Sequence, residues 1–343
     1  MRRHAAARFA VLATGAGACG ACDYRRGALD PASPDAMLIQ ILWWVFFWTA
    51  AFVFTGVLVA LAVALYRGRG RATAQGSSPD VHPDAALERR TERAVLAATA
   101  LSVVILVSLL LASVFGGRTL FRSPHAPLHA KLVAHQWWWE IQYHGKTASD
   151  LVTTANELHL PAGVPVDVEL ASADVIHSLW IPNLHGKRDL IPGHLSHLVL
   201  RPARPGSYEG RCAEFCGLQH AKMDLRVIVE PPAQFSAWLT AARRPAPPPA
   251  TASAQRGAEI FARGPCGMCH GVVGSKASAS AGPDLTHFAS RAWLGAGALP
   301  NSALNLRAWL EDPQAVKPGV QMPPTRLPAG ELDDLLAYLG TLR

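Results

Sequence analysis

Charged residues are scarce in this 343-residue chain: Asp, Glu, Lys and Arg together make up 17% of it, while half of the residues are hydrophobic. Two stretches, residues 38–65 and 94–117, contain no charged residue at all. A helix needs roughly 20 apolar residues to cross the hydrocarbon core of a bilayer. Both stretches exceed that length, which favours spanning helices over buried core helices. We therefore expect a transmembrane hairpin within residues 37–117, with spans at about 38–65 and 94–116.

The chain also lacks a basic patch of the kind that binds nucleic acid. Its net charge is +7, but residues 117–242 carry 11 basic and 11 acidic side chains and are neutral. The connection between the two uncharged stretches holds six arginines: Arg67, Arg69, Arg71, Arg89, Arg90 and Arg93. Short basic connections stay in the cytoplasm. We therefore expect two passes through the lipid bilayer, everything after residue 117 on the outer side, and no nucleic-acid partner.

The N-terminus has the pattern of a secretory signal. Arg2, Arg3 and Arg8 form a basic start, and residues 9–18 are small and apolar. This pattern predicts a signal peptide over residues 1–22 that is removed from the mature protein. Cys19 or Cys22 follows small residues and is a candidate for a lipid-modified mature N-terminus. The alternatives are an uncleaved signal or a free thiol.

Cysteine is rare, and its placement leaves none for a structural disulfide. Of six cysteines, two lie near the predicted processing site and the other four lie in two short motifs. The second motif, Cys266-Gly-Met-Cys269-His270, is the C-x-x-C-H signature of a covalently attached c-type haem. Both thiols would form thioethers, and His270 would be the proximal axial ligand. Met322, the one methionine after the motif, is the predicted distal ligand, and His287 is its competitor.

The first motif concentrates soft metal ligands in twelve residues. Segment 212–223 contains two cysteines four positions apart, a histidine and a methionine: Cys212, Cys216, His220 and Met223. Thiolate, thioether and imidazole ligands together select copper. The two thiolates are spaced to bridge two copper ions, and a further ligand must come from elsewhere, with His177 the best candidate. The alternative is a disulfide between Cys212 and Cys216.

The pattern of apolar runs divides the rest of the chain into two domains. Short runs between turn residues predict a β-sandwich or barrel over residues 118–242, with strands near 128–134, 157–160, 164–170, 197–200 and 225–229. Residues 243–253 form a linker rich in proline and alanine, which is semi-rigid. Residues 254–343 form a small helical unit, with helices expected at 254–261, 304–310 and 331–342.

These motifs together resemble bacterial cytochrome c oxidase subunit II with a C-terminally fused cytochrome c domain, the caa3 type. The resemblance rests on the copper motif and on residues 28–31, 136–139, 174–178, 186–189, 191–193 and 282–288. It implies a multidomain membrane protein: a two-helix transmembrane hairpin, a cupredoxin-like β-barrel and an all-α cytochrome c domain. It also implies a bacterial plasma-membrane location with both domains on the periplasmic side.

The resemblance further implies a binuclear copper centre, CuA, and a ligand set. Cys212 and Cys216 would bridge both coppers, and His177 and His220 would each bind one. The weak ligands would be Met223 and the backbone carbonyl of Glu214. The Glu214 side chain would instead face a magnesium ion shared with subunit I.

The implied function is that of the electron-input subunit of a haem–copper terminal oxidase. Electrons would pass from haem c through CuA to haem a of subunit I, where oxygen is reduced to water. The implied partners are subunits I and III and, upstream, a quinol–cytochrome c reductase or a small cytochrome. Trp137 matches the family's electron port, although its ring could also serve as core or as a membrane-interface anchor. Whether the cytochrome domain docks on Trp137 or moves is left open.

One region departs from the family pattern. A glutamate near the start of the second span usually stands at the mouth of a proton channel, followed by an aromatic residue. Here residues 87–93 are strongly basic and contain no tryptophan. Glu88 or Glu92 is the candidate, and the alternative is that both are solvated partners of neighbouring arginines.

Three rival functions fit less of the sequence. A quinol oxidase subunit of the same fold would lack the copper ligands. The copper domain of a nitrous-oxide reductase would require a large propeller domain that is absent from these 343 residues. A membrane-anchored copper carrier or sensor would have no use for the haem motif.

Overall fold

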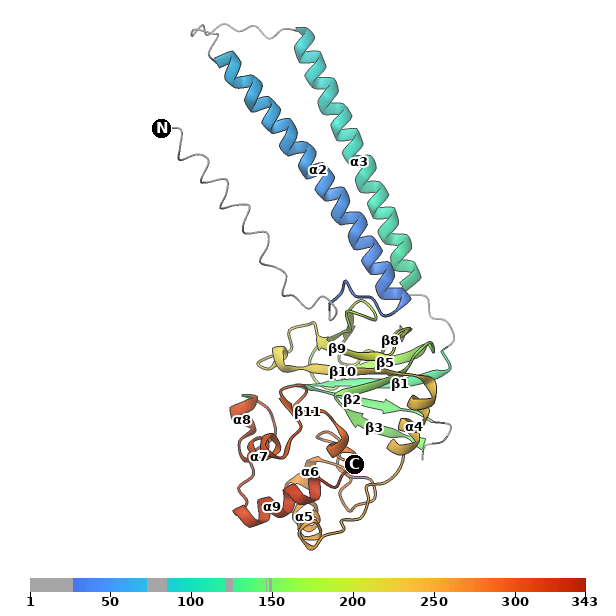
Figure 1. Ribbon diagram of the computed structural model, residues 1–343, viewed down its shortest axis with the longest axis vertical. Helices are drawn as coiled ribbons and strands as arrows, with labels where there is room; N and C mark the ends of the chain where they lie inside the picture. Colours follow the sequence, from blue (N-terminus) through green and yellow to red (C-terminus); the bar gives the residue numbers. More distant parts are fainter. Residues whose placement is uncertain (1–26, 73–84, 121–125, 146, 148–149) are drawn as a thin grey trace. The chain divides into compact units, whose positions relative to one another are not determined.

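A computed structural model describes residues 27–72, 85–120, 126–145, 147 and 150–343 of the chain (Figure 1). The predicted signal peptide, with Cys19 and Cys22, lies outside the described residues. The chain divides into two compact units, one made of residues 37–122 and the other of the residues before and after them. Each unit is described separately below.

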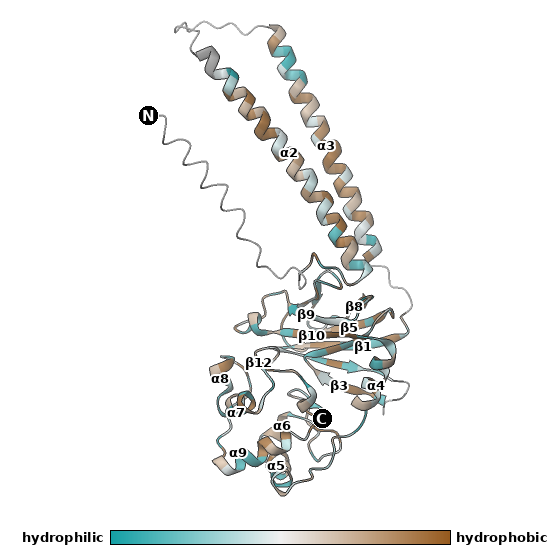
Figure 2. Cartoon of the chain, in the orientation of Figure 1, coloured by the Kyte–Doolittle hydropathy of each residue, from teal (hydrophilic) through white to brown (hydrophobic). Residues whose placement is uncertain are grey.

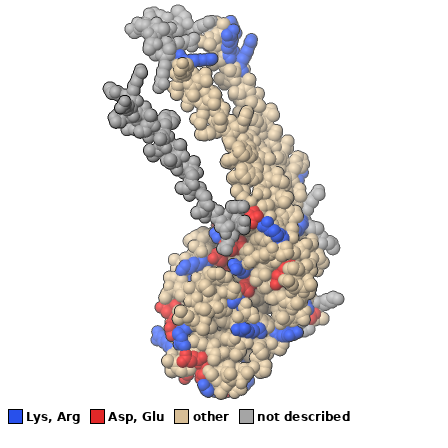
Figure 3. Space-filling view, viewed as in Figure 1, with Lys and Arg blue, Asp and Glu red and all other residues tan. Residues whose placement is uncertain are grey.

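The first unit is a pair of long helices, α2 (Pro34–Ala72) and α3 (Ala85–Leu120). Both are long and apolar enough to cross a membrane, and the side seen in Figure 2 is mostly hydrophobic along their middle. Figure 3 shows almost no Lys, Arg, Asp or Glu along the middle of this unit. Gly116 of α3 is buried, and a Cβ there would lie 2.9 Å from Leu42 of α2, so glycine lets the two helices approach closely.

The second unit contains two five-stranded sheets and, within the predicted cytochrome domain, a two-stranded sheet of β11 (Trp293–Leu294) and β12 (Leu299–Pro300). The first has the order β3-β2-β1-β5-β8 and the second β4-β10-β9-β6-β7. The strands of the first sheet are β1 (Leu128–His135), β2 (Trp138–Tyr143), β3 (Val152–Ala155), β5 (Val166–Ser172) and β8 (Ser196–Leu200). Those of the second are β4 (Glu157–Pro161), β6 (His177–Trp180), β7 (Arg188–Leu190), β9 (Gly206–Cys212) and β10 (Asp224–Glu230).

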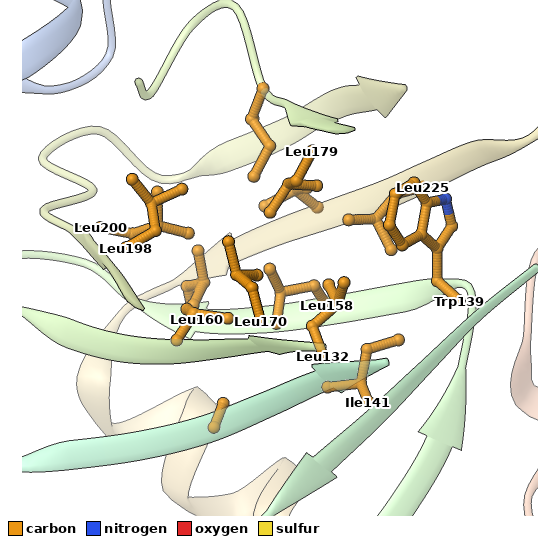
Figure 4. Close-up of a cluster of buried hydrophobic side chains, with 14 of the residues drawn as sticks. Leu132, Trp139, Ile141, Leu158, Leu160, Leu170, Leu179, Leu198, Leu200 and Leu225 are labelled. Carbon is orange, nitrogen blue, oxygen red and sulfur yellow. The ribbon is translucent and has the colours of Figure 1, made fainter. Parts of the chain in front are cut away.

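The core of this sandwich lies between the inner faces of the sheets (Figure 4). In β1 and β10 alternate residues are buried, as expected for strands with one face inward. Leu132, Ile141 and Leu170 are fully buried, and burial of each such side chain contributes about 2 kcal/mol. All five predicted strands are present. The other five strands of the sandwich were not predicted; among them β7 is very short and β9 is polar, with the sequence GSYEGRC.

The helical part of this unit follows α4 (Pro232–Ala242). It contains α5 (Ala252–Arg263), α6 (Cys266–Cys269), α7 (Ala303–Glu311), α8 (Pro313–Val316) and α9 (Ala329–Leu339). The Thr251 side chain caps α5 by accepting from the Ala254 amide. α5 packs against α9 so closely that a Cβ on Gly257 would lie 2.0 Å from the Asp334 carbonyl oxygen. α9 ends at Leu339, three residues earlier than predicted.

Candidate metal centres

The copper motif lies at one end of the second sheet. Cys212 is the last residue of β9 and His177 is the first residue of β6, and these two strands are neighbours in that sheet. The chain then continues through a loop and a short 3-10 helix (His220–Lys222) before β10 begins at Asp224. Strand pairing therefore places His177 beside a cysteine that is 35 positions away in sequence.

The structure brings all six predicted copper donors together. The two sulfur atoms of Cys212 and Cys216 are 3.7 Å apart, and donor atoms of His177, Cys212 and Cys216 all lie within 4.8 Å of one another. The remaining contacts are Cys212 Sγ–His177 Nδ1 3.8 Å, Cys216 Sγ–His220 Nδ1 3.7 Å, Cys216 Sγ–Met223 Sδ 3.8 Å and Cys212 Sγ–Glu214 O 3.2 Å. The sulfur separation is far longer than the ~2.05 Å of a disulfide. Both cysteines are free thiols.

Asp174 orients the buried histidine of this cluster. Its carboxylate lies 2.8 Å from His177 Nε2, so the other ring nitrogen, Nδ1, faces the sulfur atoms. Carboxylates often fix a metal-binding imidazole in this way. Burial opposes protonation of His177, but hydrogen bonds to Cys212 and Asp174 outweigh it and raise the pKa. Asp174 is not among the predicted site residues, although an acid three positions before a candidate ligand is a usable signal in sequence.

The two thiols share a proton in the metal-free protein. The hydrogen bond from Cys216 lowers the pKa of Cys212 to about 3, and the same interaction raises the pKa of Cys216. The thiolate is the form that binds metal, and this hydrogen bond favours it at Cys212. Because a metal must displace the remaining proton, copper affinity should rise with pH.

The segment before β2 closes one side of the copper loop. Gln136 Nε2 and Trp137 Nε1 both donate to the Cys216 carbonyl, at 2.7 and 3.0 Å. Trp137 is buried. Trp139 lies in the core, and Trp138 stacks on His135. Among the three consecutive tryptophans, Trp137 is thus the one bonded to the backbone of a predicted bridging ligand.

The haem motif forms a short helix with its histidine directly after it. α6 carries Cys266 and Cys269, and His270 Nδ1 lies 2.7 Å from the Pro283 carbonyl, to which it donates. That hydrogen bond leaves Nε2 as the nitrogen available to iron. Burial lowers the pKa of His270, which favours the neutral, ligating form. A Cβ on Gly282 would lie 2.7 Å from the imidazole, so glycine is required there. These residues fit a covalently bound haem.

The two candidates for the distal ligand are used differently. Met322 lies in the segment between α8 and α9 and packs, half-buried, against the helical core. His287 instead points its Nε2 at the linker, 3.1 Å from the carbonyl oxygens of both Ala242 and Arg244. His287 is thereby occupied in holding the start of the linker.

The two proton-channel candidates lie at the start of α3. Glu88 and Glu92 are four residues apart, which places them on one face of that helix, and both are exposed. The Glu214 side chain is also exposed, while its backbone carbonyl faces Cys212.

A β-sandwich with a sulfur-rich copper site, joined to a helical domain with a C-x-x-C-H motif, defines an electron-transfer protein of the cupredoxin–cytochrome type. Residues 128–230 match the family model for the periplasmic domain of cytochrome c oxidase subunit II, and residues 254–343 match that for cytochrome c. The chain is 31% identical over 329 residues to cytochrome c oxidase subunit 2 of Alkalihalophilus pseudofirmus, covering 92% of this chain and 90% of that protein. It therefore belongs to the cytochrome c oxidase subunit 2 family.

Two further relatives cover parts of the chain. Cytochrome c oxidase subunit 2 of Bacillus sp. (strain PS3) is 33% identical over 221 residues, 61% of each chain. The crystal structure of the periplasmic domain of subunit II of cytochrome oxidase (CoxB) of Bradyrhizobium japonicum is 28% identical and covers 36% of this chain and 97% of its own, with a TM-score of 0.33.

Membership of this family confirms the predicted family, fold class and role. The chain is the electron-input subunit of a haem–copper oxidase, with a cytochrome c domain in the same polypeptide, and its partner is subunit I. The family implies that it binds copper and haem c. Two apolar helices anchor it to the membrane, with the copper domain outside.

Proposed function

We propose that this chain receives electrons one at a time at its cytochrome domain and passes them to subunit I through two copper ions held by the 212–223 loop and His177. The observation that carries the proposal is the convergence of six soft and carbonyl donors around two sulfur atoms 3.7 Å apart. When bound, the copper pair supplies a one-electron carrier. The protein's part is to hold that carrier still.

The ligand roles follow from the contacts of each donor. Cys212 and Cys216 each have a different histidine within 3.8 Å, which suits two bridging sulfurs with one imidazole per copper. Met223 approaches Cys216, and the Glu214 carbonyl approaches Cys212, as weak ligands on opposite sides would. Hydrogen bonds from Gln136 and Trp137 hold the loop in place, so the ligands need to move little when the copper centre gains or loses an electron.

The exposed Glu214 side chain is available for a magnesium ion shared with subunit I. Its own carbonyl faces the copper site, so its carboxylate lies on the outer side of the loop. Carboxylate oxygens are typical magnesium ligands. We propose the same residue links the two ions through its backbone and its side chain.

For the haem we propose covalent attachment at Cys266 and Cys269, with His270 and Met322 as axial ligands. The free Nε2 of His270 and the engagement of His287 by the linker support this choice over a bis-histidine site. A Met/His pair gives a higher potential than two histidines, as suits a donor to a strong oxidant.

The membrane arrangement remains part of the proposal. We propose a signal peptide at 1–22, two spans within 37–117, a copper domain at 118–242, a linker at 243–253 and a cytochrome domain at 254–343. Glu88 or Glu92 would stand at a proton-channel mouth on the cytoplasmic side. Subunit III is the further partner, and a quinol–cytochrome c reductase or a small cytochrome is the upstream donor.

The test is the visible, near-infrared and EPR spectra of the full chain in detergent, after copper loading and haem maturation. We expect an EPR signal delocalised over two coppers, together with a low-spin c-type haem. Cys216→Ser should abolish the first signal and leave the second. A mononuclear or readily exchanged copper in the wild-type chain would contradict the proposal and favour a copper-binding module.

A further inference from the structure

One lysine of the cytochrome domain is buried against the copper domain. Lys317, directly after α8, is 1% exposed, and its Nζ donates to the Trp137 carbonyl at 2.6 Å and to the Gly295 carbonyl at 2.9 Å. The first acceptor belongs to the copper domain and the second to the cytochrome domain. Both domains lie in the same compact unit.

Two side chains of the copper loop bind the backbone around this lysine. Gln219 Nε2 donates to the Pro318 carbonyl at 2.7 Å, and Lys222 Nζ donates to the Val316 carbonyl at 2.6 Å. Gly319 has a φ of +86°, and a Cβ there would lie 2.9 Å from Leu218. The copper loop therefore holds segment 316–319 in place. Met322, the proposed haem ligand, follows three residues after this segment.

A second set of contacts lies away from this segment. The Ala292 amide donates to Glu157 Oε1 at 2.8 Å, and the Asp224 amide donates to the Ala296 carbonyl at 3.1 Å. The Arg226 guanidinium lies 5.9 Å from the centre of the Trp293 ring. The contact between the domains is therefore broad, and these two amides, which belong to residues other than the two that Lys317 bonds, report on it.

Full burial of a lysine is unfavourable unless its nitrogen is well bonded. Burial lowers the pKa of Lys317 to about 7, and the nearby Asp224 carboxylate partly opposes this. An ammonium has three N–H groups and a neutral amine has two, so either form can serve both carbonyls. An incidental contact would leave such a side chain in solvent.

We propose that Lys317 is a positioning residue that fastens the Met322 segment to Trp137, so that the electron crosses between the domains in one bound arrangement. This inference rests on the proposed haem and copper ligands. In the step, reduced haem iron loses one electron and the copper centre gains it, and no bond forms or breaks. The linker then limits how far the domains separate, while Lys317 determines where they meet.

The first test is amide hydrogen exchange of the full chain carrying Lys317→Met, which keeps the aliphatic stem and removes the donor. Loss of two buried hydrogen bonds should speed exchange of the Ala292 and Asp224 amides about 10- to 100-fold. Amides of core strand β1 should not change, which distinguishes undocking from unfolding. Lys276→Met, at an exposed lysine of the same domain, is the matched control and should behave as wild type.

The second test is the rate of electron transfer from haem to copper after flash reduction of the loaded chain. We expect Lys317→Met to slow it at least about tenfold and to make it depend on solvent viscosity, with haem and copper spectra unchanged. Unchanged exchange and an unchanged rate would overturn the proposal. Missing copper or haem signals with faster exchange would instead contradict the proposed ligands and leave the docking role standing.

An exposed residue provides a second variant if Lys317→Met fails to fold. Lys222→Met removes the bond to the Val316 carbonyl at an exposed residue, where a substitution changes no buried packing. It should accelerate exchange of the same two amides about threefold, in line with the smaller worth of exposed charge-assisted contacts. No acceleration in either variant would contradict the proposal.

Discussion

The copper site and the haem site are built in opposite ways. The proposed copper donors come from adjoining strand ends and one loop, and the donor atoms of His177, Cys212 and Cys216 already lie within 4.8 Å of one another in the folded chain. The proposed haem-binding residues come from a four-residue helix, from the histidine directly after it, and from a segment without regular structure some fifty positions later. A sheet can preassemble a small metal site, whereas a large cofactor must itself become part of the core that holds it.

The largest effect should come from removing the haem attachment. In the Cys266→Ala/Cys269→Ala double variant we expect complete loss of covalent haem and a lower unfolding temperature for the helical domain. The copper EPR signal should persist, because His177 and the 212–223 loop depend on the sheet. Calorimetry and haem-stained denaturing gels would measure this. Loss of both signals together would mean that the two sites are not built independently.

A packing change should weaken the helical domain alone. A methyl group at Gly257 would collide with the Asp334 carbonyl, so Gly257→Ala should destabilise this domain by about 3 kcal/mol. Gly330→Ala is the matched control, because a Cβ there meets nothing within 4 Å. Chemical unfolding followed by haem absorbance would compare the two. Equal stability of both variants would refute the close α5–α9 contact.

A substitution at Asp174, which bonds the proposed copper ligand His177, should weaken copper binding and leave haem binding unchanged. Asp174→Asn removes the carboxylate that orients His177, and we expect copper affinity to fall about 10- to 100-fold. Competition with a copper chelator would measure it. Asp167→Asn, whose carboxylate pairs with His129 and His197 on the surface, should leave the affinity unchanged.

The smallest effect should be the pH dependence of stability that comes from His159, a buried residue of β4. Burial lowers the pKa of His159, which stacks on Trp238 and lies 3.1 Å from Glu230. The unfolded chain therefore binds the proton more tightly, so this stability is fully present above the unfolded pKa of about 6.5 and is lost as pH falls below it. The free energy of unfolding in urea should be lower at pH 5.5 than at pH 8. We expect this decrease to be about 1 kcal/mol smaller in His159→Gln than in wild type. An equal pH dependence would contradict this.

Several features could be predicted because their signals are local. A few neighbouring residues are enough to indicate each of these features: the run of 28 uncharged residues, the C-x-x-C-H motif, and the sulfur side chains at positions 212, 216 and 223. The alternating strands were found for the same reason. The polar strand β9 was missed because its buried positions are Tyr208, Gly210 and Cys212, which form no run of apolar residues.

Other features depended on chain segments that only the fold brings together. His177 is a plausible ligand by resemblance, but strand pairing places it beside Cys212, and Asp174 then fixes its ring. Lys317 resembles any surface lysine in sequence. Its burial against the Trp137 carbonyl joins positions 180 residues apart.

The sequence by itself therefore determined the membrane anchor and the two kinds of redox motif, because apolar length and ligand chemistry are properties of short segments. The tertiary structure alone decided which ring nitrogen of His177 faces the sulfur atoms, that His287 bonds the start of the linker, and that the cytochrome domain lies against Trp137. Those choices depend on hydrogen bonds between distant residues, and such bonds exist only once the chain has folded.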